Sequence, residues 1–172
     1  MLDMSKRTQQ YKETQDALRL LKRKMPIVAR TRVEGHEAHV YTKMLYATCN
    51  GVVRRIGRLH IVLPTLPNGG DKRVSVMNDS SVVLASENGI RRAHHPYVYG
   101  TRSGSVHICW GNDVGQAVHD ACYGKDVYIA LSMLLLWLQD CTELARNMPK
   151  YIGEWPLATP AEERAWRSTH EG

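Results

Sequence analysis

The middle of the chain holds the residues best suited to chemistry. From His94 to Asn112, nineteen residues contain three histidines, a proline, a cysteine and a tryptophan. The regular apolar pattern stops in this stretch, so these residue types are expected to serve a site. A thiol is nucleophilic where its surroundings expose it and stabilise its thiolate. Cys109 is therefore the candidate nucleophile, and the alternative that it is one more small buried apolar residue stays open.

The four cysteines show neither a Cys-x-x-Cys pair nor the spacing of a disulfide framework. This usage favours a reducing compartment with free thiols, and we expect Cys122 and Cys141 to lie in the core. The first residues lack the apolar run of a signal peptide. The longest apolar run, residues 127–138, is shorter than the roughly 20 residues that cross a bilayer. A cytoplasmic protein without a membrane segment is expected.

Basic residues are concentrated at the N-terminus of a chain whose net charge is +6. Residues 1–32 hold nine Lys and Arg against three acidic residues. An arm of this kind is more often a solvated helix face than a nucleic-acid reader, so nucleic-acid binding is disfavoured and an acidic protein partner is the functional alternative. The partner-binding candidates are Lys6, Arg7, Lys12, Arg19, Lys22 and Arg23.

Hydrophobic periodicity and turn residues predict an α+β fold with helices packed on an antiparallel sheet. The patterns first predict a helix from a Ser5 cap to about Lys24 and then a meander of three to five strands between Ile27 and Leu84. An irregular segment around the candidate cysteine follows. The chain is then predicted to form a core helix from an Asp126 cap to about Asn147 and a short polar helix over 161–168. Asn50-Gly51 is the strongest hairpin indication. The expected organisation is a basic helix over 1–26, a main domain over 27–157 and a tail over 158–172.

This order of elements, with His95-Pro96-Tyr97 ahead of a loop and Gly104-Ser105-Val106-His107-Ile108-Cys109 before a helix, resembles the ubiquitin-conjugating (UBC-like) family. Its bacterial members show His-Pro-His-Val, a variable loop, and Cys-Leu-Gly-Asn. This chain reads His-Pro-Tyr-Val, a loop, and Cys-Trp-Gly-Asn. Residues 57–63 and 69–74 also look like the bacterial group. The resemblance covers roughly residues 45–148.

The resemblance implies an enzyme whose cysteine, here Cys109, carries a ubiquitin-like protein as a thioester. The partners would be that ubiquitin-like protein, an activating enzyme that loads it and a target protein whose lysine receives it. No cofactor is implied. The bacterial members point to a ubiquitin-like conjugation or antiphage defence system.

The same resemblance suggests roles for the neighbours of Cys109. His95 and Pro96 would be structural residues of the loop. Tyr97 stands where the eukaryotic enzymes have an asparagine that stabilises the oxyanion, so it is either a phenolic donor or a packing residue. Asn112 has the missing amide chemistry and is the alternative donor. His107 would lie on the same side of an extended segment as Cys109 and could lower the thiol pKa or act as a base.

Three flanking residues are expected to be less important. His94 should be exposed to solvent, and Trp110 should pack beneath the loop. Asp113 could orient or deprotonate an incoming lysine, although an exposed loop aspartate is the default expectation.

Two other functions compete with the conjugating enzyme. The chain could be a non-catalytic UBC-like binding module in which the cysteine is incidental. It could also be a small metal-binding domain, because His94, His95, His107 and Cys109 are zinc-type ligands. No pair of them has the usual spacing of zinc ligands, and Pro96 is better explained by the family motif, so no metal is expected.

Overall fold

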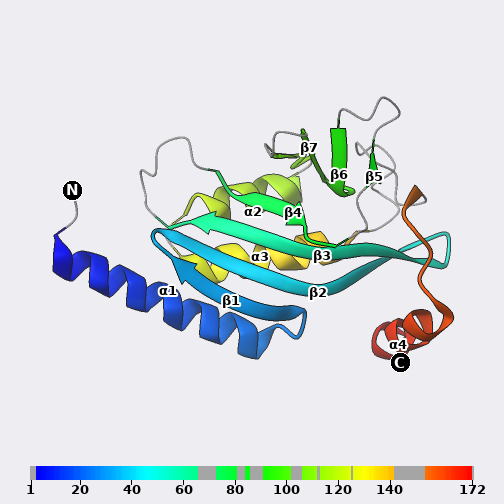
Figure 1. Cartoon of the computed structure of the whole chain (residues 1–172), viewed down its shortest axis with the longest axis horizontal. Helices are drawn as coiled ribbons and strands as arrows, with labels where there is room; N and C mark the ends of the chain where they lie inside the picture. The colour runs from blue at the N-terminus through cyan, green and yellow to red at the C-terminus, as the bar shows by residue number, and fades with distance from the viewer. Residues whose placement is uncertain are drawn as a thin grey trace.

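A helix and a four-stranded antiparallel meander form the N-terminal half of the chain, as the sequence predicts (Figure 1). The computed structural model describes residues 3–65, 73–80, 84–85, 91–101, 106–111, 113–124, 126–141 and 154–171. Helix α1 spans Met4–Lys24, and its cap is Asp3 rather than the predicted Ser5, because the Ser5 N–H donates to the Asp3 carboxylate at 2.7 Å. The strands, in sheet order, are β1 Val28–Glu34, β2 Glu37–Cys49, β3 Val52–Pro64 and β4 Ser75–Asn78.

The long hairpin of β2 and β3 is the backbone of this sheet. In the sequence this hairpin appears as short separate apolar runs, and the structure joins them into two continuous strands. The register of the pairing shifts near Tyr41–Tyr46, where the alternation of apolar and polar residues is interrupted. Asn50 and Gly51 form the predicted turn, with φ of 52° and 77°. Positive φ at both positions matches a type I′ turn, whose twist fits that of the flanking strands.

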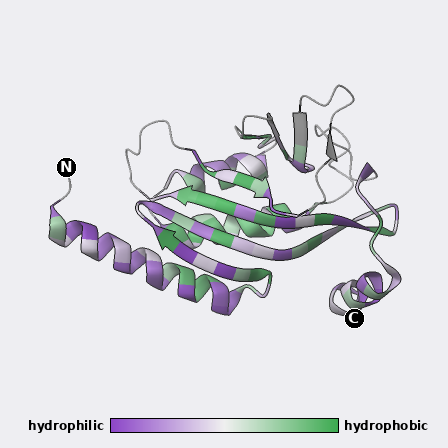
Figure 2. Cartoon of the chain, in the orientation of Figure 1, coloured by the Kyte–Doolittle hydropathy of each residue, from purple (hydrophilic) through white to green (hydrophobic). Residues whose placement is uncertain are grey.

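The core lies between the sheet and helix α3, Val127–Gln139, which in Figure 1 runs behind the strands. Leu131, Leu134, Leu135 and Leu138 of this helix are buried. Apolar and polar residues alternate along β1 to β3 in Figure 2, as expected for strands with one buried face. Within the described residues, no helix is both long and apolar enough to cross a membrane.

The segment that was predicted to be irregular forms a second antiparallel sheet instead. Its strands, in sheet order, are β5 Leu84–Ala85, β6 Arg91–His95, β7 Val98–Thr101 and β8 Val106–Ile108. Strands of two to five residues are too short to show alternation in the sequence. Helix α2, Asp113–Cys122, follows and was also missed, so Asp113 opens a helix rather than lying in a loop.

The last two helices, α3 and α4, begin close to the residues that the sequence predicts. Asp126 caps α3 by accepting from the Ile129 N–H at 2.9 Å, as predicted. This helix ends at Gln139, earlier than the expected Asn147, and residues 142–153 lie outside the described residues. Helix α4, Pro160–His170, contains the predicted polar helix and begins with a capping box.

The segment before α4 continues the main sheet. The Arg55 N–H donates to the Pro156 carbonyl at 2.7 Å, and the Ala158 N–H donates to the Val53 carbonyl at 3.0 Å. The side chain of Trp155 is fully buried there. These contacts hold the C-terminal segment along the part of β3 that β4 does not cover.

Asn78 joins the two sheets. Its side-chain amide donates to the carbonyls of Ile56, at 2.8 Å, and His94, at 3.0 Å. Gly57 lies directly beneath that amide with φ of 131°, and a Cβ there would overlap the Asn78 side chain. The junction of β3, β4 and β6 therefore requires a glycine at position 57.

Replacement of Gly57 by alanine tests this junction. Gly57→Ala should lower the free energy of unfolding by about 3 kcal/mol, because it combines backbone strain with the clash against Asn78. Gly35→Ala is the matched control, since Gly35 also has positive φ but has no atom within 4 Å of an added Cβ. It should cost only about 1 kcal/mol. If urea unfolding shows that both variants lose the same free energy of unfolding, the junction does not require a glycine at position 57.

Candidate active site

Cys109 is the one partly exposed cysteine of the four, all of which lie in the described residues. It follows β8, and its N–H donates to the Tyr97 carbonyl at 2.8 Å. The other three side chains are 4 to 7% exposed. Burial raises the pKa of both Cys122 and Cys141 to about 12, so these thiols stay protonated near neutral pH, and both lie in the core as predicted.

Two glycines shape the chain after Cys109. Gly111 has φ of 65°, which favours glycine in the Cys-Trp-Gly-Asn sequence. Gly115, in the first turn of α2, lies so close to the Trp110 carbonyl that a Cβ would overlap it. The segment that carries the thiol is thus packed directly on a helix. Asn112 lies outside the described residues, and its role as oxyanion donor stays a prediction.

His95 holds the turn that precedes β7. It is 1% exposed; the Tyr97 N–H donates to its Nδ1 at 3.0 Å, and its Nε2 lies 2.7 Å from the Leu138 carbonyl. Since Nδ1 accepts, Nε2 carries the proton and donates to that carbonyl. Burial lowers the pKa of His95 to about 4, so the ring is neutral at neutral pH. This geometry agrees with a structural role, which the buried Pro96 shares.

His94 is buried, contrary to the expectation that it is exposed. It is 7% exposed, and its Nδ1 accepts from the Asn78 N–H at 2.9 Å. The expectation was wrong because β6 lies beside β4, which the sequence does not reveal.

Tyr97 is packed against the end of α3. Its ring stacks on Trp137, with 4.6 Å between the centroids, and its hydroxyl donates to the Asp140 carbonyl at 3.3 Å. Burial raises the pKa of this phenol well above its ordinary value. Since the hydroxyl proton is used at α3, the arrangement favours packing over oxyanion donation for Tyr97.

A hollow of about 420 Å³ lies beside β8 and α2, and Cys109 itself is not among the described residues that line it. It is lined by Arg73, Val74, Val106, His107, Ile108, Trp110, His119 and Tyr123, which include both chain neighbours of Cys109. His107 is exposed and its ring lies 5.0 Å from that of Tyr99. Half-buried Trp110 stacks on Trp137, as a packing residue would.

The zinc alternative meets a geometric obstacle. Both ring nitrogens of His95 are bonded to backbone groups, so this ring would have to leave its site to bind a metal. Among the described residues, no group of three or more His, Cys, Asp and Glu side chains could hold an ion.

The basic residues of α1 do not join the Cys109 site. Helix α1 lies along β1 at one edge of the main sheet, whereas β6 and β8 adjoin β4 at the other edge (Figure 1). The six partner-binding candidates, Lys6, Arg7, Lys12, Arg19, Lys22 and Arg23, are all exposed. Any partner that touches both regions must span the sheet.

Three further residues that support the site were not singled out from the sequence. Trp137 and Asp140 belong to the apolar helix and its cap, and Asn78 is the last residue of β4. Their contacts with Tyr97 and His94 cross from one element to another, and no local pattern indicates them.

Comparison of the chain with protein-family models, with curated proteins and with solved structures gives no match.

The buried neutral ring of His95 predicts a pH dependence of stability. Its folded pKa, about 4, lies below the ordinary value of 6.5, so the unfolded chain takes up a proton that the folded chain refuses. The free energy of unfolding should therefore fall as the pH drops from about 6.5 to 4, by on the order of 3 kcal/mol from this group. His95→Gln cannot titrate and should show a shallower slope in urea unfolding across this range. An unchanged slope would contradict the assignment.

The difference in thiol burial predicts a simple titration. In the native protein, dithiodipyridine should modify one thiol at least about 100-fold faster than the others. Cys109→Ser should remove that fast phase, whereas Cys49→Ala should leave it intact, because Cys49 is buried. The absorbance of the released thiopyridone measures the rate of modification in the native protein and in both variants. A fast phase that survives Cys109→Ser would show that another thiol is the accessible one.

Proposed function

We propose that this protein is a ubiquitin-conjugating-enzyme-like carrier that holds a ubiquitin-like protein as a thioester on Cys109 and transfers it to a lysine of a target. The observation that supports the proposal is the placement of Cys109. This residue is partly exposed and its backbone is bonded to the His-Pro-Tyr turn, while the other three cysteines are buried.

The proposed chemistry comprises two acyl transfers. The Cys109 thiolate attacks the thioester carbonyl on an activating enzyme, whose own thiolate leaves. The target amine then attacks the new thioester, the Cys109 thiolate leaves and the amine gives up a proton, so that an amide is formed. Each step passes through an oxyanion that needs preorganised donors. The Tyr97 hydroxyl already donates to the Asp140 carbonyl. The proposed donors to the oxyanion are therefore the Asn112 side chain and backbone N–H groups.

His107 is proposed to lower the pKa of the Cys109 thiol or to act as a base, rather than to position the loop. It is exposed, lies two residues before Cys109 and lines the hollow beside β8. His95 is excluded from such a role in this arrangement, because both of its nitrogens are occupied.

The biological setting follows from the resemblance to bacterial proteins. We propose that the chain acts in the cytoplasm, within a ubiquitin-like conjugation or antiphage defence system. A non-catalytic binding module on the same fold would not require a thiol at position 109, and this difference separates the two functions experimentally.

A loading assay tests the function. Incubation with the cognate activating enzyme, ATP and the ubiquitin-like protein should produce an adduct that thiols cleave and that maps to Cys109. Cys109→Ser should fold normally, form either a thiol-resistant oxyester or no adduct, and lose transfer to lysine, because an amine attacks an oxyester far less readily. Cys49→Ala is the control and should load like the wild type.

Two results would contradict the proposal. An adduct that maps to another cysteine would show that Cys109 is not the carrier. Full biological activity of Cys109→Ser would show that the protein acts as a binding module.

The basic face of α1 is proposed to dock the activating enzyme. Reversal of Lys6, Lys12 and Arg19 to glutamate should slow loading by about 10-fold at low salt and weaken its salt dependence, because the exposed charges act by long-range attraction. The matched control reverses Lys43, Arg58 and Arg164, which are exposed elsewhere, and changes the net charge equally. Equal loading rates for the two variants would show that the α1 charges only solvate the helix.

A further inference from the structure

Two histidines are in contact on the outer face of the main sheet. Ala38 and Val40 of β2 are fully buried in the core. His39 and Tyr41 alternate with them and therefore point to the opposite face, the one away from α3 (Figure 1). On that face the Nδ1 atom of His39 lies 2.9 Å from the Nε2 atom of His60 in β3.

The geometry of this contact is that of a hydrogen bond between two rings. The ring centroids are 5.1 Å apart and the ring planes differ by 30°, so the two nitrogens meet edge to edge rather than face to face. Such a contact requires one hydrogen between the nitrogens, which either His39 or His60 donates. Two bare nitrogens, or two N–H groups, would repel each other at this distance.

The second nitrogen of His39 faces two carboxylates. His39 is 6% exposed, and its Nε2 atom is buried with no hydrogen-bond partner among the described residues. One carboxylate oxygen of Glu34 and one of Glu37 each lie 3.8 Å from this atom. Glu34 is also paired with Arg32 at 2.8 Å, and Glu37 is the less exposed of the two carboxylates. Glu37 therefore supplies the stronger attraction for a proton on His39.

The ring of His60 is half-buried and belongs to a row of cross-strand neighbours. It stacks on Tyr41, with 4.2 Å between the ring centroids and 11° between the planes. The guanidinium carbon of Arg30 lies 4.0 Å from the centre of the Tyr41 ring. Arg30 in β1 and His60 in β3 are the residues opposite Tyr41 on its two sides. Both faces of Tyr41 are thus covered while the two histidines are in contact.

The charged and titratable groups that face the pair come from three strands. They are Arg30, Arg32 and Glu34 of β1, Glu37 and Tyr41 of β2, and Asp79 directly after β4. Burial is the largest cause that lowers the pKa of His60 below its ordinary value of 6.5, and His39 is the next. The two arginines lower it further, and Asp79 opposes them. A proton on His39 thus makes a proton on His60 harder to add.

The number of protons decides whether the contact can exist. When both rings are neutral, one hydrogen lies between them. One added proton leaves the contact intact, because His39 can carry hydrogens on both nitrogens while the Nε2 atom of His60 accepts. A second added proton places a hydrogen on all four ring nitrogens. Two N–H groups then meet head-on, and the contact must break.

We propose that the His39–His60 pair is a pH-sensitive latch on the outer face of the sheet, closed with no added proton or with one and opened by a second. Because His39 is buried, the half-buried ring of His60 is the one that swings out. Its movement uncovers one face of Tyr41 and adds a positive charge near Arg30. Since the pKa of His60 lies below 6.5, the latch opens on the acid side of that value.

Nitrogen NMR of the full chain tests the latch, because the shifts of the imidazole nitrogens report the protonation of each ring. The signals of His39 and His60 are followed from about pH 8 down to the pH at which the chain unfolds. The pair should titrate in two coupled steps at least about one pH unit apart. Nuclear Overhauser effects between the Tyr41 and His60 rings should persist through the first step and disappear with the second, while the amide signals of β2 and β3 remain those of a folded sheet.

Three variants locate the coupling in this pair. In His39→Gln, His60 should titrate in a single step at a higher pH than in the wild type, because the neighbouring ring that opposes its proton is gone. His60→Gln should leave a single step for His39, and it serves in place of the first variant if circular dichroism shows that His39→Gln does not fold. His36→Gln is the matched control, since His36 is an exposed histidine of the same hairpin, and both steps should stay unchanged.

Any of three results overturns the proposal. The first is independent single-step titration of His39 and His60 in the wild type. The second is persistence of the ring contacts after both rings are protonated. The third is loss of these contacts only when the whole chain unfolds. None of these measurements involves Cys109, so their outcome does not depend on the proposed conjugating activity.

Discussion

The hydrogen bond from His95 Nε2 to the Leu138 carbonyl is the contact on which the candidate site depends. It joins the turn of the small sheet to the last turn of the core helix α3, and it is fully buried. A neutral ring is required, since one nitrogen must accept from the Tyr97 N–H while the other donates. Loss of this bond would leave buried polar groups unpaired on both sides, which is costly.

The neighbouring His94 makes the opposite connection. His95 reaches α3, whereas His94 reaches Asn78 in the main sheet. Strand β6 is held on both sides as a result. The Cys109 N–H is bonded to the carbonyl of Tyr97 in the same turn, so the backbone at the candidate nucleophile is tied to these contacts.

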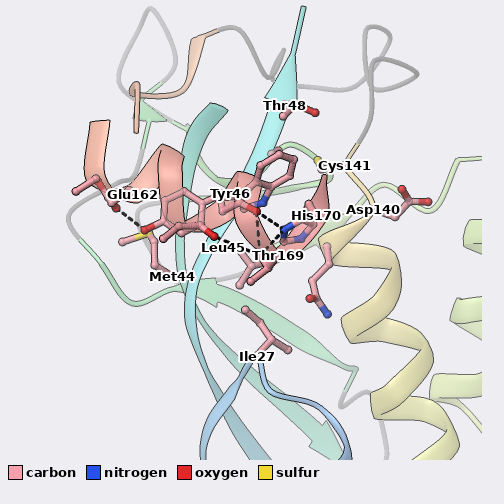
Figure 3. A pocket seen from close by; sticks show the side chains of 15 residues that line it. Ile27, Met44, Leu45, Tyr46, Thr48, Asp140, Cys141, Glu162, Thr169 and His170 are labelled. Atoms are coloured by element: carbon pink, nitrogen blue, oxygen red, sulfur yellow. Dashed lines mark hydrogen bonds between the residues drawn. The ribbon is translucent and has the colours of Figure 1, made fainter. Parts of the chain in front are cut away.

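The end of α3 serves two regions. Through Leu138 and the Asp140 carbonyl it holds the His-Pro-Tyr turn, and through Gln139, Asp140 and Cys141 it lines the cavity beside α4. The His-Pro-Tyr turn and the cavity (Figure 3) thus share one structural element while using different groups of it. The basic α1 helix lies at the far edge of the sheet, which leaves it available for a separate contact.

Local patterns in the sequence determined α1, the Asn50-Gly51 turn, the start of α3 at Asp126 and the core position of Cys122 and Cys141. Periodicity, turn chemistry and caps act over a few residues, so they can be read from the chain. The motif also singled out Cys109 and His95. Only the tertiary structure decided that the segment around them is a sheet of very short strands, that His94 is buried against Asn78, that the Tyr97 hydroxyl bonds to Asp140 and that a cavity lies under α4. Each of these depends on residues brought together from distant parts of the chain, 43 positions apart for Tyr97 and Asp140, and such contacts leave no pattern in a single sequence.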